Sequence, residues 1–121
     1  MLFRSFYAER LLKTPGEIRA IERAQRATEE AVEGALDVLR RSKIRGHKIY
    51  HRGEVVTSEL LKRVINVKLM ERACVAKNTI VASGDHGCDP HNRGTGPVRP
   101  DQTLILDVFP RSGETDRKSV V

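Results

Sequence analysis

The strongest local signal in this sequence is a helix start at residues 14–17. Thr14 can cap a helix, Pro15 suits the first helical position, and Glu17 stands three positions after the cap. Apolar residues then recur at helical spacing, so we predict a helix from about Pro15 to about Arg41. Its apolar stripe is rich in alanine and should pack closely against a neighbouring element: Ile18, Ile21, Ala24, Thr28, Ala31, Ala35, Val38 and Leu39.

A second amphipathic helix is predicted after residues 42–56. Thr57 or Ser58 caps it, and its broad apolar face ends near Ala73. The intervening residues 42–56 are basic and contain two glycines, Gly46 and Gly53, so we predict a basic loop or a short hairpin there. His47 and His51 are interpreted as surface residues of this segment. Two successive amphipathic helices form a layer that must cover another element.

Strand-like sequence appears only after both helices. Residues 79–83 are short and β-branched, and residues 103–109 are the most strand-like run in the chain, which Pro110 ends. Helices first and strands afterwards predict an α+β fold, with two helices packed on a small open antiparallel sheet. Residues 84–97, between the strands, form a loop rich in glycine, proline and side chains that can bind ligands.

Composition excludes several classes of protein. The 121 residues suffice for one domain, and no apolar run approaches the ~20 residues of a membrane span, so we expect no membrane contact. Lys and Arg number 22 against 16 Asp and Glu, but most are interleaved with Glu on helical stretches. We therefore expect a solvated mixed-charge surface and no nucleic-acid partner. Cys74 and Cys88 are too few for a disulfide scaffold, which favours a cytoplasmic location.

Asp107 is the clearest candidate for chemistry, because it interrupts an apolar strand. Burying a lone carboxylate costs several kcal/mol unless a cation or several donors satisfy it. Two interpretations stay open from the residues alone. Asp107 is either a structural residue at a strand end, facing solvent or paired with Arg, or a carboxylate that binds metal or takes part in catalysis.

The loop also contains four side chains that are compatible with zinc, namely His86, Cys88, Asp89 and His91. No second pair of Cys or His stands at the spacing of a structural zinc module. A polar loop with a turn-forming Asp is therefore the favoured interpretation, and a small zinc site is the minor alternative.

Taken together, these segments resemble a known family. Residues 13–18 (Lys-Thr-Pro-Gly-Glu-Ile) resemble the start of the catalytic domain of aminopeptidase P and prolidase-like peptidases. Residues 80–84, 90–94 and 104–108 are similar to the family's core, in which a short strand and a loop His precede the strand with the first metal-binding Asp. The resemblance is to the pita-bread metallopeptidases, including Xaa-Pro dipeptidase and creatinase, and covers residues 13–112.

The resemblance implies a fold and an activity. Family peptidases hold two divalent cations, commonly Mn, Co or Zn, with two Asp, one His and two Glu, and a bridging water attacks the scissile carbonyl. Xaa-Pro peptidases release the N-terminal residue that precedes a proline, so the implied partner is a peptide substrate. By position, Asp107 matches the first metal ligand, and His91 matches the catalytic loop His that contacts substrate.

The sequence also departs from the family. The second metal Asp has only Asp116 as a candidate, and the His and Glu ligands of the second half have no counterpart. One or two carboxylates make a poor site for a cation that takes about four to six ligands, so we expect no stably bound metal. The layout implied is a leader (1–12), the first half of a pita-bread catalytic domain (13–112) and a divergent tail (113–121).

The expected function follows from this layout. We expect a truncated metallopeptidase-like protein that is not catalytically competent alone. The alternative is a non-enzymatic module of the same fold that binds peptide or nucleic acid. Half of a continuous sheet leaves an open edge and uncovered apolar surface, so a homodimer is a further expectation.

Overall fold

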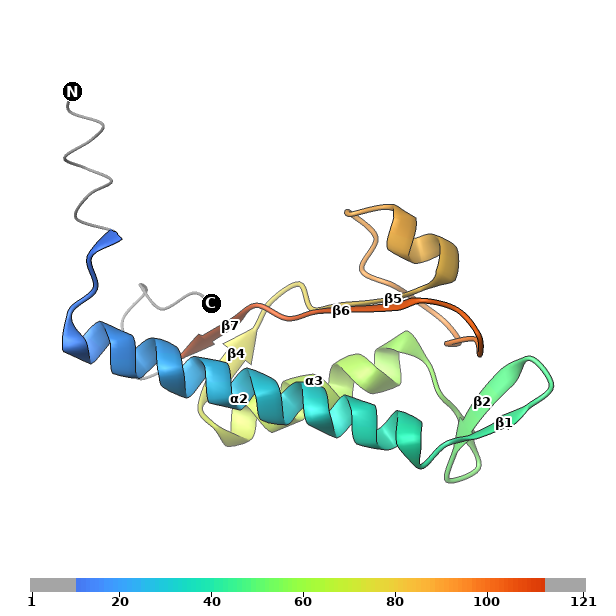
Figure 1. Cartoon of the computed structure of the whole chain (residues 1–121). Helices are drawn as coiled ribbons and strands as arrows, with labels where there is room; N and C mark the ends of the chain where they lie inside the picture. The colour runs from blue at the N-terminus through green and yellow to red at the C-terminus, as the bar shows by residue number, and fades with distance from the viewer. Residues whose placement is uncertain (1–10, 113–121) are drawn as a thin grey trace.

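The computed structural model describes residues 11–112 of the chain (Figure 1). Helices α2 (Pro15–Arg40) and α3 (Ser58–Glu71) lie side by side, and a ribbon of strands runs along them. This is the α+β class that the sequence predicts. The remaining elements are β1 (Lys43–Arg45), β2 (Lys48–His51), β3 (Glu54–Val55), β4 (Cys74–Ala76), β5 (Ile80–Ser83), the short 3-10 helix η1 (Gly84–Cys88), β6 (Leu104–Asp107) and β7 (Pro110–Ser112).

The start of α2 is the predicted capping box. The Thr14 Oγ1 accepts a hydrogen bond from the Glu17 backbone N–H at 3.2 Å, and the Glu17 carboxylate accepts one from the Thr14 N–H at 3.0 Å. Two of the backbone donors left free at a helix start are thereby satisfied. The predicted first helix is confirmed, with Arg41 as its C-terminal cap.

The two helices pack through alanine on one side and large aliphatic residues on the other. The buried residues of α2 are all alanine, at spacings of three and four: Ala20, Ala24, Ala27, Ala31 and Ala35. Leu61, Ile65 and Leu69 of α3 are fully buried. Arg72 at the end of α3 pairs with Glu30, whereas Lys68 lies beside Gly34, so the helices are antiparallel. Of these alanines, Ala27, Ala31 and Ala35 belong to the same core cluster as the α3 residues and leave room for their side chains.

The predicted stripe on α2 is only partly right. Ile18 was expected to face the core but is 46% exposed. The pairing of Arg72 with Glu30 places α3 against the C-terminal part of α2. Helix α3 has 14 residues against 26 in α2, so it is too short to cover the first turns.

Residues 43–55 form a three-stranded antiparallel meander, so the hairpin alternative is confirmed and extended. Arg45 pairs with Lys48 around a two-residue turn in which Gly46 has a φ of +62°. Both residues of the next turn, Arg52 and Gly53, also have positive φ. Such turns match the right-handed twist of paired strands.

The other four strands form one long antiparallel ribbon. Ala76 of β4 pairs with Pro110 of β7, and Ile80 of β5 pairs with Asp107 of β6. Between these two pairs, the β4–β5 side of the ribbon has one residue more than the β6–β7 side, which is a β-bulge. Asn78 lies within this bulge and has a φ of +61°.

The ribbon corrects two details of the prediction. The sheet is not single, because one three-stranded and two two-stranded sheets are formed within the described residues. Pro110 does not end the last strand but begins β7, which pairs with the unpredicted β4. A two-stranded ribbon has a free edge, where a residue without an N–H is tolerated.

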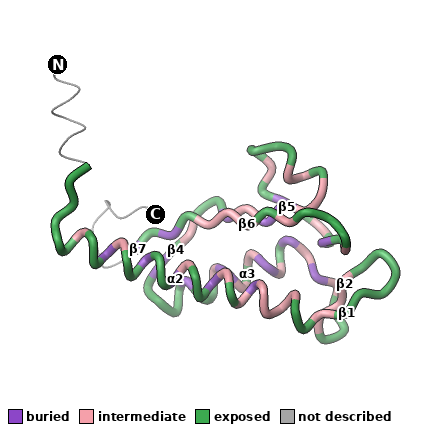
Figure 2. Tube along the Cα trace, viewed as in Figure 1, coloured by how far each residue is buried: buried purple, intermediate pink, exposed green. Residues whose placement is uncertain are grey.

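The hydrophobic core lies between the helices and the ribbon (Figure 2). Val56, Val81 and Val98 join the α3 residues there. Val98 donates its N–H to the Val56 carbonyl oxygen at 3.0 Å, so the chain after the long loop returns into the core. No helix within residues 11–112 is long and apolar enough to cross a membrane.

Candidate functional site

The ribbon has one face toward the core and one face away from the helices. Leu104, Leu106 and Val108 pack against the core. Side chains alternate along a strand, so the residues between them project from the opposite side. We call this opposite side the outer face, and it consists of Val75, Ile80, Ala82, Ile105, Asp107, Phe109 and Arg111.

Asp107 lies on the outer face, half-buried and directly opposite Ile80. Its carboxylate makes no hydrogen bond or ion pair with any residue from 11 to 112, so the Arg pair that the structural interpretation allowed is not formed there. A half-buried carboxylate without donors has lost part of its hydration and gained nothing in return. Its oxygens therefore remain free to accept a cation or a donor from another group.

The loop that carries His91 is fixed by side-chain hydrogen bonds to its own backbone. The Asp89 carboxylate accepts a bond from the His91 N–H at 2.9 Å, and the Asn92 side-chain oxygen accepts one from the Gly94 N–H at 2.8 Å. These are Asx turns, which hold a loop without regular secondary structure. The His91 imidazole is exposed and has no hydrogen-bond partner within the described residues.

A second anchor ties the end of this loop to the first turns of α3. The Gly96 N–H donates to both carboxylate oxygens of Glu59 at 3.1 Å, and the Lys62 Nζ donates to the Gly94 carbonyl oxygen at 2.6 Å. Hydrogen bonds from the backbone N–H of Glu59 itself and of Gly96 lower the pKa of the Glu59 carboxyl below its ordinary value. Sequence analysis gave Glu59 no role.

A cavity of about 590 Å³ opens beside the outer face. His91 and Pro90 line it from the loop, and Ile80 and Phe109 line it from the ribbon. Asp107 is not a lining residue, but it lies opposite Ile80 and two positions before Phe109. The structure thus brings His91 and Asp107 to the same side of the ribbon, at the cavity and at its border.

The cavity is electropositive, which the sequence did not suggest. Lys77, Arg93 and Arg111 line it together with His91, and no Asp or Glu is among its lining residues. Arg111 could have been found from the sequence, because residues 105, 107, 109 and 111 share a face if the strand continues past Pro110. Lys77 and Arg93 could not have been found by this alternation, because each lies outside a regular strand.

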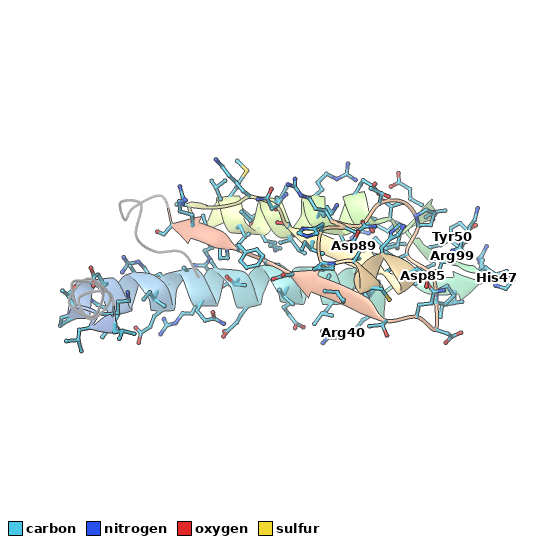
Figure 3. The ribbon with its side chains drawn as sticks, turned by 90° about the horizontal axis from the view of Figure 1, so that it is seen from above. Arg40, His47, Tyr50, Asp85, Asp89 and Arg99 are labelled. Atoms are coloured by element: carbon cyan, nitrogen blue, oxygen red, sulfur yellow. The ribbon has the colours of Figure 1, made fainter. Side chains whose placement is uncertain are left out.

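The zinc alternative for the loop is wrong for the described residues. Nowhere between residues 11 and 112 do three side chains of His, Cys, Asp or Glu gather at metal-binding distance. Cys88 is exposed and Cys74 is buried, and neither forms a disulfide within the described residues. Figure 3 labels Asp85 and Asp89 on the loop between β5 and β6, and Figure 1 shows η1 on the side of the ribbon that faces away from the helices. Asp116 lies outside the described residues.

His51 corrects another expectation. It is half-buried rather than a surface residue, and its Nδ1 is buried with no hydrogen-bond partner in the described part of the chain. Its partner residue in the meander is Glu54. His47, at the first turn of the meander, is exposed as expected (Figure 3).

Comparison with known proteins gives one match. The family model described as metallopeptidase family M24 matches residues 19–115, which is most of the chain. Searches of curated proteins and of solved structures found no significant match. The matched range includes α2 from Arg19 onward, all of α3, the ribbon, His91 and Asp107.

Proposed function

Since the chain belongs to metallopeptidase family M24, we propose that its described residues are the first half of a peptidase catalytic domain. The two helices and the antiparallel ribbon are a partial form of that family's fold. The family is generally metal-dependent.

We propose Asp107 as a ligand of a catalytic divalent cation. The observation that carries this proposal is the position of an unpaired, half-buried carboxylate on the outer face, beside the cavity that His91 lines. A carboxylate with both oxygens free suits Mn, Co or Zn. A purely structural Asp would be expected to have a donor or an Arg nearby.

The described residues do not fit a complete metal centre. A divalent cation in a protein takes about four to six ligands, and residues 11–112 bring no three candidate ligands together. Lys77, Arg93 and Arg111 around the cavity further disfavour a cation held by Asp107 alone. We therefore derive no metal-dependent step from this chain.

His91 is proposed to contact a peptide substrate in the cavity. Ile80, Phe109 and Pro90 offer an apolar lining on which a proline ring of an Xaa-Pro peptide can pack, and the lining cations suit the free carboxylate of a short peptide. The exposed imidazole can donate a hydrogen bond to a peptide carbonyl. Release of the residue before proline is the proposed activity of the complete catalytic domain.

We propose that the 121-residue chain alone does not hydrolyse Xaa-Pro peptides. The one carboxylate that residues 11–112 place beside the cavity cannot hold two cations. The expectation that it binds no metal stably remains a prediction. No feature of the outer face favours the alternative, a non-enzymatic module, over a peptidase. We also propose a location in the reducing cytoplasm, because two cysteines are too few for a disulfide scaffold.

Paramagnetic broadening of amide NMR signals by Mn²⁺ tests the metal proposal, because it detects even weak binding. We expect the signals of Ile80 and Asp107 to broaden first in the wild type, and this broadening to disappear in Asp107→Asn. The matched control is Asp101→Asn, which removes an equally charged but exposed carboxylate. Broadening centred on Asp85 and Asp89 that survives Asp107→Asn would contradict the proposal.

Hydrolysis of an Xaa-Pro dipeptide with added Mn²⁺, Co²⁺ or Zn²⁺ tests competence separately. We expect no turnover above the metal-only reaction. Turnover that Asp107→Asn abolishes would show that the chain is competent, while keeping Asp107 in the site. Turnover that is unchanged in both Asp107→Asn and His91→Ala would remove both residues from the proposed site.

A further inference from the structure

The whole net charge of the chain is concentrated in one short segment. Residues 40–53 contain six Lys and Arg and no Asp or Glu, and these cations are Arg40, Arg41, Lys43, Arg45, Lys48 and Arg52. The chain has 22 basic and 16 acidic residues, so the rest has 16 of each and is neutral. The expectation that positive charge is spread over the surface therefore does not describe this segment.

Only two of these six cations are neutralised within the described residues. Arg40 pairs with Glu33, and Arg41 pairs with Asp37 at 3.2 Å, along α2. The four in the meander, Lys43, Arg45, Lys48 and Arg52, form no ion pair with any residue from 11 to 112. The meander extends beyond the C-terminal end of α2, where its tip is exposed (Figures 1 and 2).

Strand alternation places three of the four unpaired cations on one side. Lys43 lies opposite Tyr50, and Arg45 lies opposite Lys48, so these four side chains share a face. Ile49, on the other side, packs against the core. The side chains on the side opposite Ile49 therefore point away from the body of the protein. We call this side the cationic face and define it as Lys43, Arg45, Lys48 and Tyr50.

The cationic face is electrostatically unfavourable as it stands. Arg45 and Lys48 are direct cross-strand neighbours, and like charges at such positions destabilise a hairpin. No Asp or Glu of the meander shares this face, since Glu54 lies opposite His51, one position out of phase. A bound anion would relieve the repulsion between Arg45 and Lys48.

We propose that the cationic face binds single-stranded nucleic acid. Its three cations would contact phosphates, and the half-buried Tyr50 would offer part of its ring to an unpaired base. An anionic membrane fits less well, because a membrane-binding surface presents apolar and cationic groups together. Here the exposed Ile44 pairs with Ile49 on the opposite face.

Fluorescence anisotropy with a labelled oligouridylate, over a range of salt concentrations, tests the proposal. We expect the double variant Arg45→Gln/Lys48→Gln to bind roughly tenfold more weakly. The slope of log K against log salt should become shallower by about 1.4, because two phosphate contacts are lost at about 0.7 each. Tyr50→Leu should weaken binding about fivefold, and Tyr50→Phe should restore most of this loss.

The matched control is Arg19→Gln/Arg26→Gln, which removes the same charge from exposed positions on α2. It should change affinity by less than about twofold, because screened charges far from the strand contribute little. Equal weakening by both double variants would overturn the proposal. So would the absence of binding, or tighter binding to polyglutamate, to phosphatidylserine vesicles or to duplex DNA. Asp107→Asn should leave binding unchanged, so this inference stands apart from the peptidase proposal.

Discussion

Gly94 lies so close to Val81 that a Cβ on Gly94 would stand 1.6 Å from the Val81 carbonyl oxygen. The Val81 N–H donates to the Arg93 carbonyl oxygen at 3.0 Å, so this stretch of the loop lies directly against β5. Gly94 also has a φ of +81°, which favours glycine. One residue thus fixes where the loop with His91 meets the ribbon.

Gly94→Ala should destabilise the protein by more than about 2 kcal/mol. A left-handed φ alone costs an alanine roughly 1–2 kcal/mol, and the clash with the Val81 carbonyl forces the loop away from β5. The free energy of unfolding, measured by urea denaturation, checks this value. Amide shifts near His91 should move as well, because the loop loses its contact with the strand.

Gly96→Ala is the matched control for this prediction. Gly96 has a φ of +74°, but a Cβ there would meet no atom within 4 Å. The substitution therefore carries the backbone strain without the clash and should cost roughly 1 kcal/mol. If both variants are equally stable, the close approach of Gly94 to Val81 does not restrict the loop.

The contact between Glu59 and Gly96 should make stability depend on pH. The folded pKa of Glu59 is lowered, so its contribution is present above the ordinary value of 4.5 and is lost as pH falls through the folded value. We expect the difference in unfolding free energy between wild type and Glu59→Gln to be largest near neutral pH. That difference should shrink below about pH 4.

Glu71→Gln is the control for the Glu59 measurement. Glu71 is also on α3, is exposed, and forms no hydrogen bond or ion pair with the described residues. Its substitution should leave the pH dependence of stability as in the wild type. A Glu59→Gln curve that runs parallel to the wild-type curve down to pH 3 would argue against the hydrogen bonds to the Gly96 N–H.

The helices could be predicted because their signals are local. The capping box at Thr14 and the alanine spacing in α2 each depend on residues a few positions apart, and both appear in the structure. Which element packs against which is decided by residues far apart in the sequence. Ile18 obeys the helical period of the stripe, yet it is exposed because α3 packs against the later turns of α2.

The ribbon was harder to predict for the same reason. Pro110 usually ends a strand, but here the missing N–H is tolerated, and β7 continues opposite a strand that starts at Cys74. The side on which Asp107 lies is set by which of its neighbours meet the helices. Alternation gives every strand two faces, and only the packing of Leu106 shows that Asp107 is on the outer one.

Ile65→Ala should lower the free energy of unfolding by about 2–5 kcal/mol. Ile65 is fully buried where α3 meets the alanine stripe of α2, so its removal leaves a cavity that rigid helices fill only partly. Val67→Ala on the same helix is the control, because Val67 is 49% exposed. That control should cost less than about 1 kcal/mol, and similar losses in both variants would contradict the packing described for α3.

The outer face should cause the chain to self-associate. Within residues 11–112, β6 and β7 pair only with β5 and β4, so one edge of the ribbon is free. Val75, Ile105 and Phe109 expose 55%, 38% and 46% of their surfaces on the outer face of this ribbon. A free strand edge next to apolar side chains is a template for pairing with another chain. A homodimer through this face remains a prediction.

Sedimentation velocity over a wide range of protein concentration measures this association. We expect a monomer–dimer equilibrium in the wild type that Phe109→Ser shifts toward the monomer. Met70→Ser is the control, because Met70 is more exposed, at 68%, but belongs to α3 rather than to the ribbon. A monomer at every concentration would contradict the prediction, and equal effects of the two substitutions would remove the outer face from the interface. Because Asp107 and the cavity lie on this face, a dimer formed there should also shield Asp107 from added Mn²⁺.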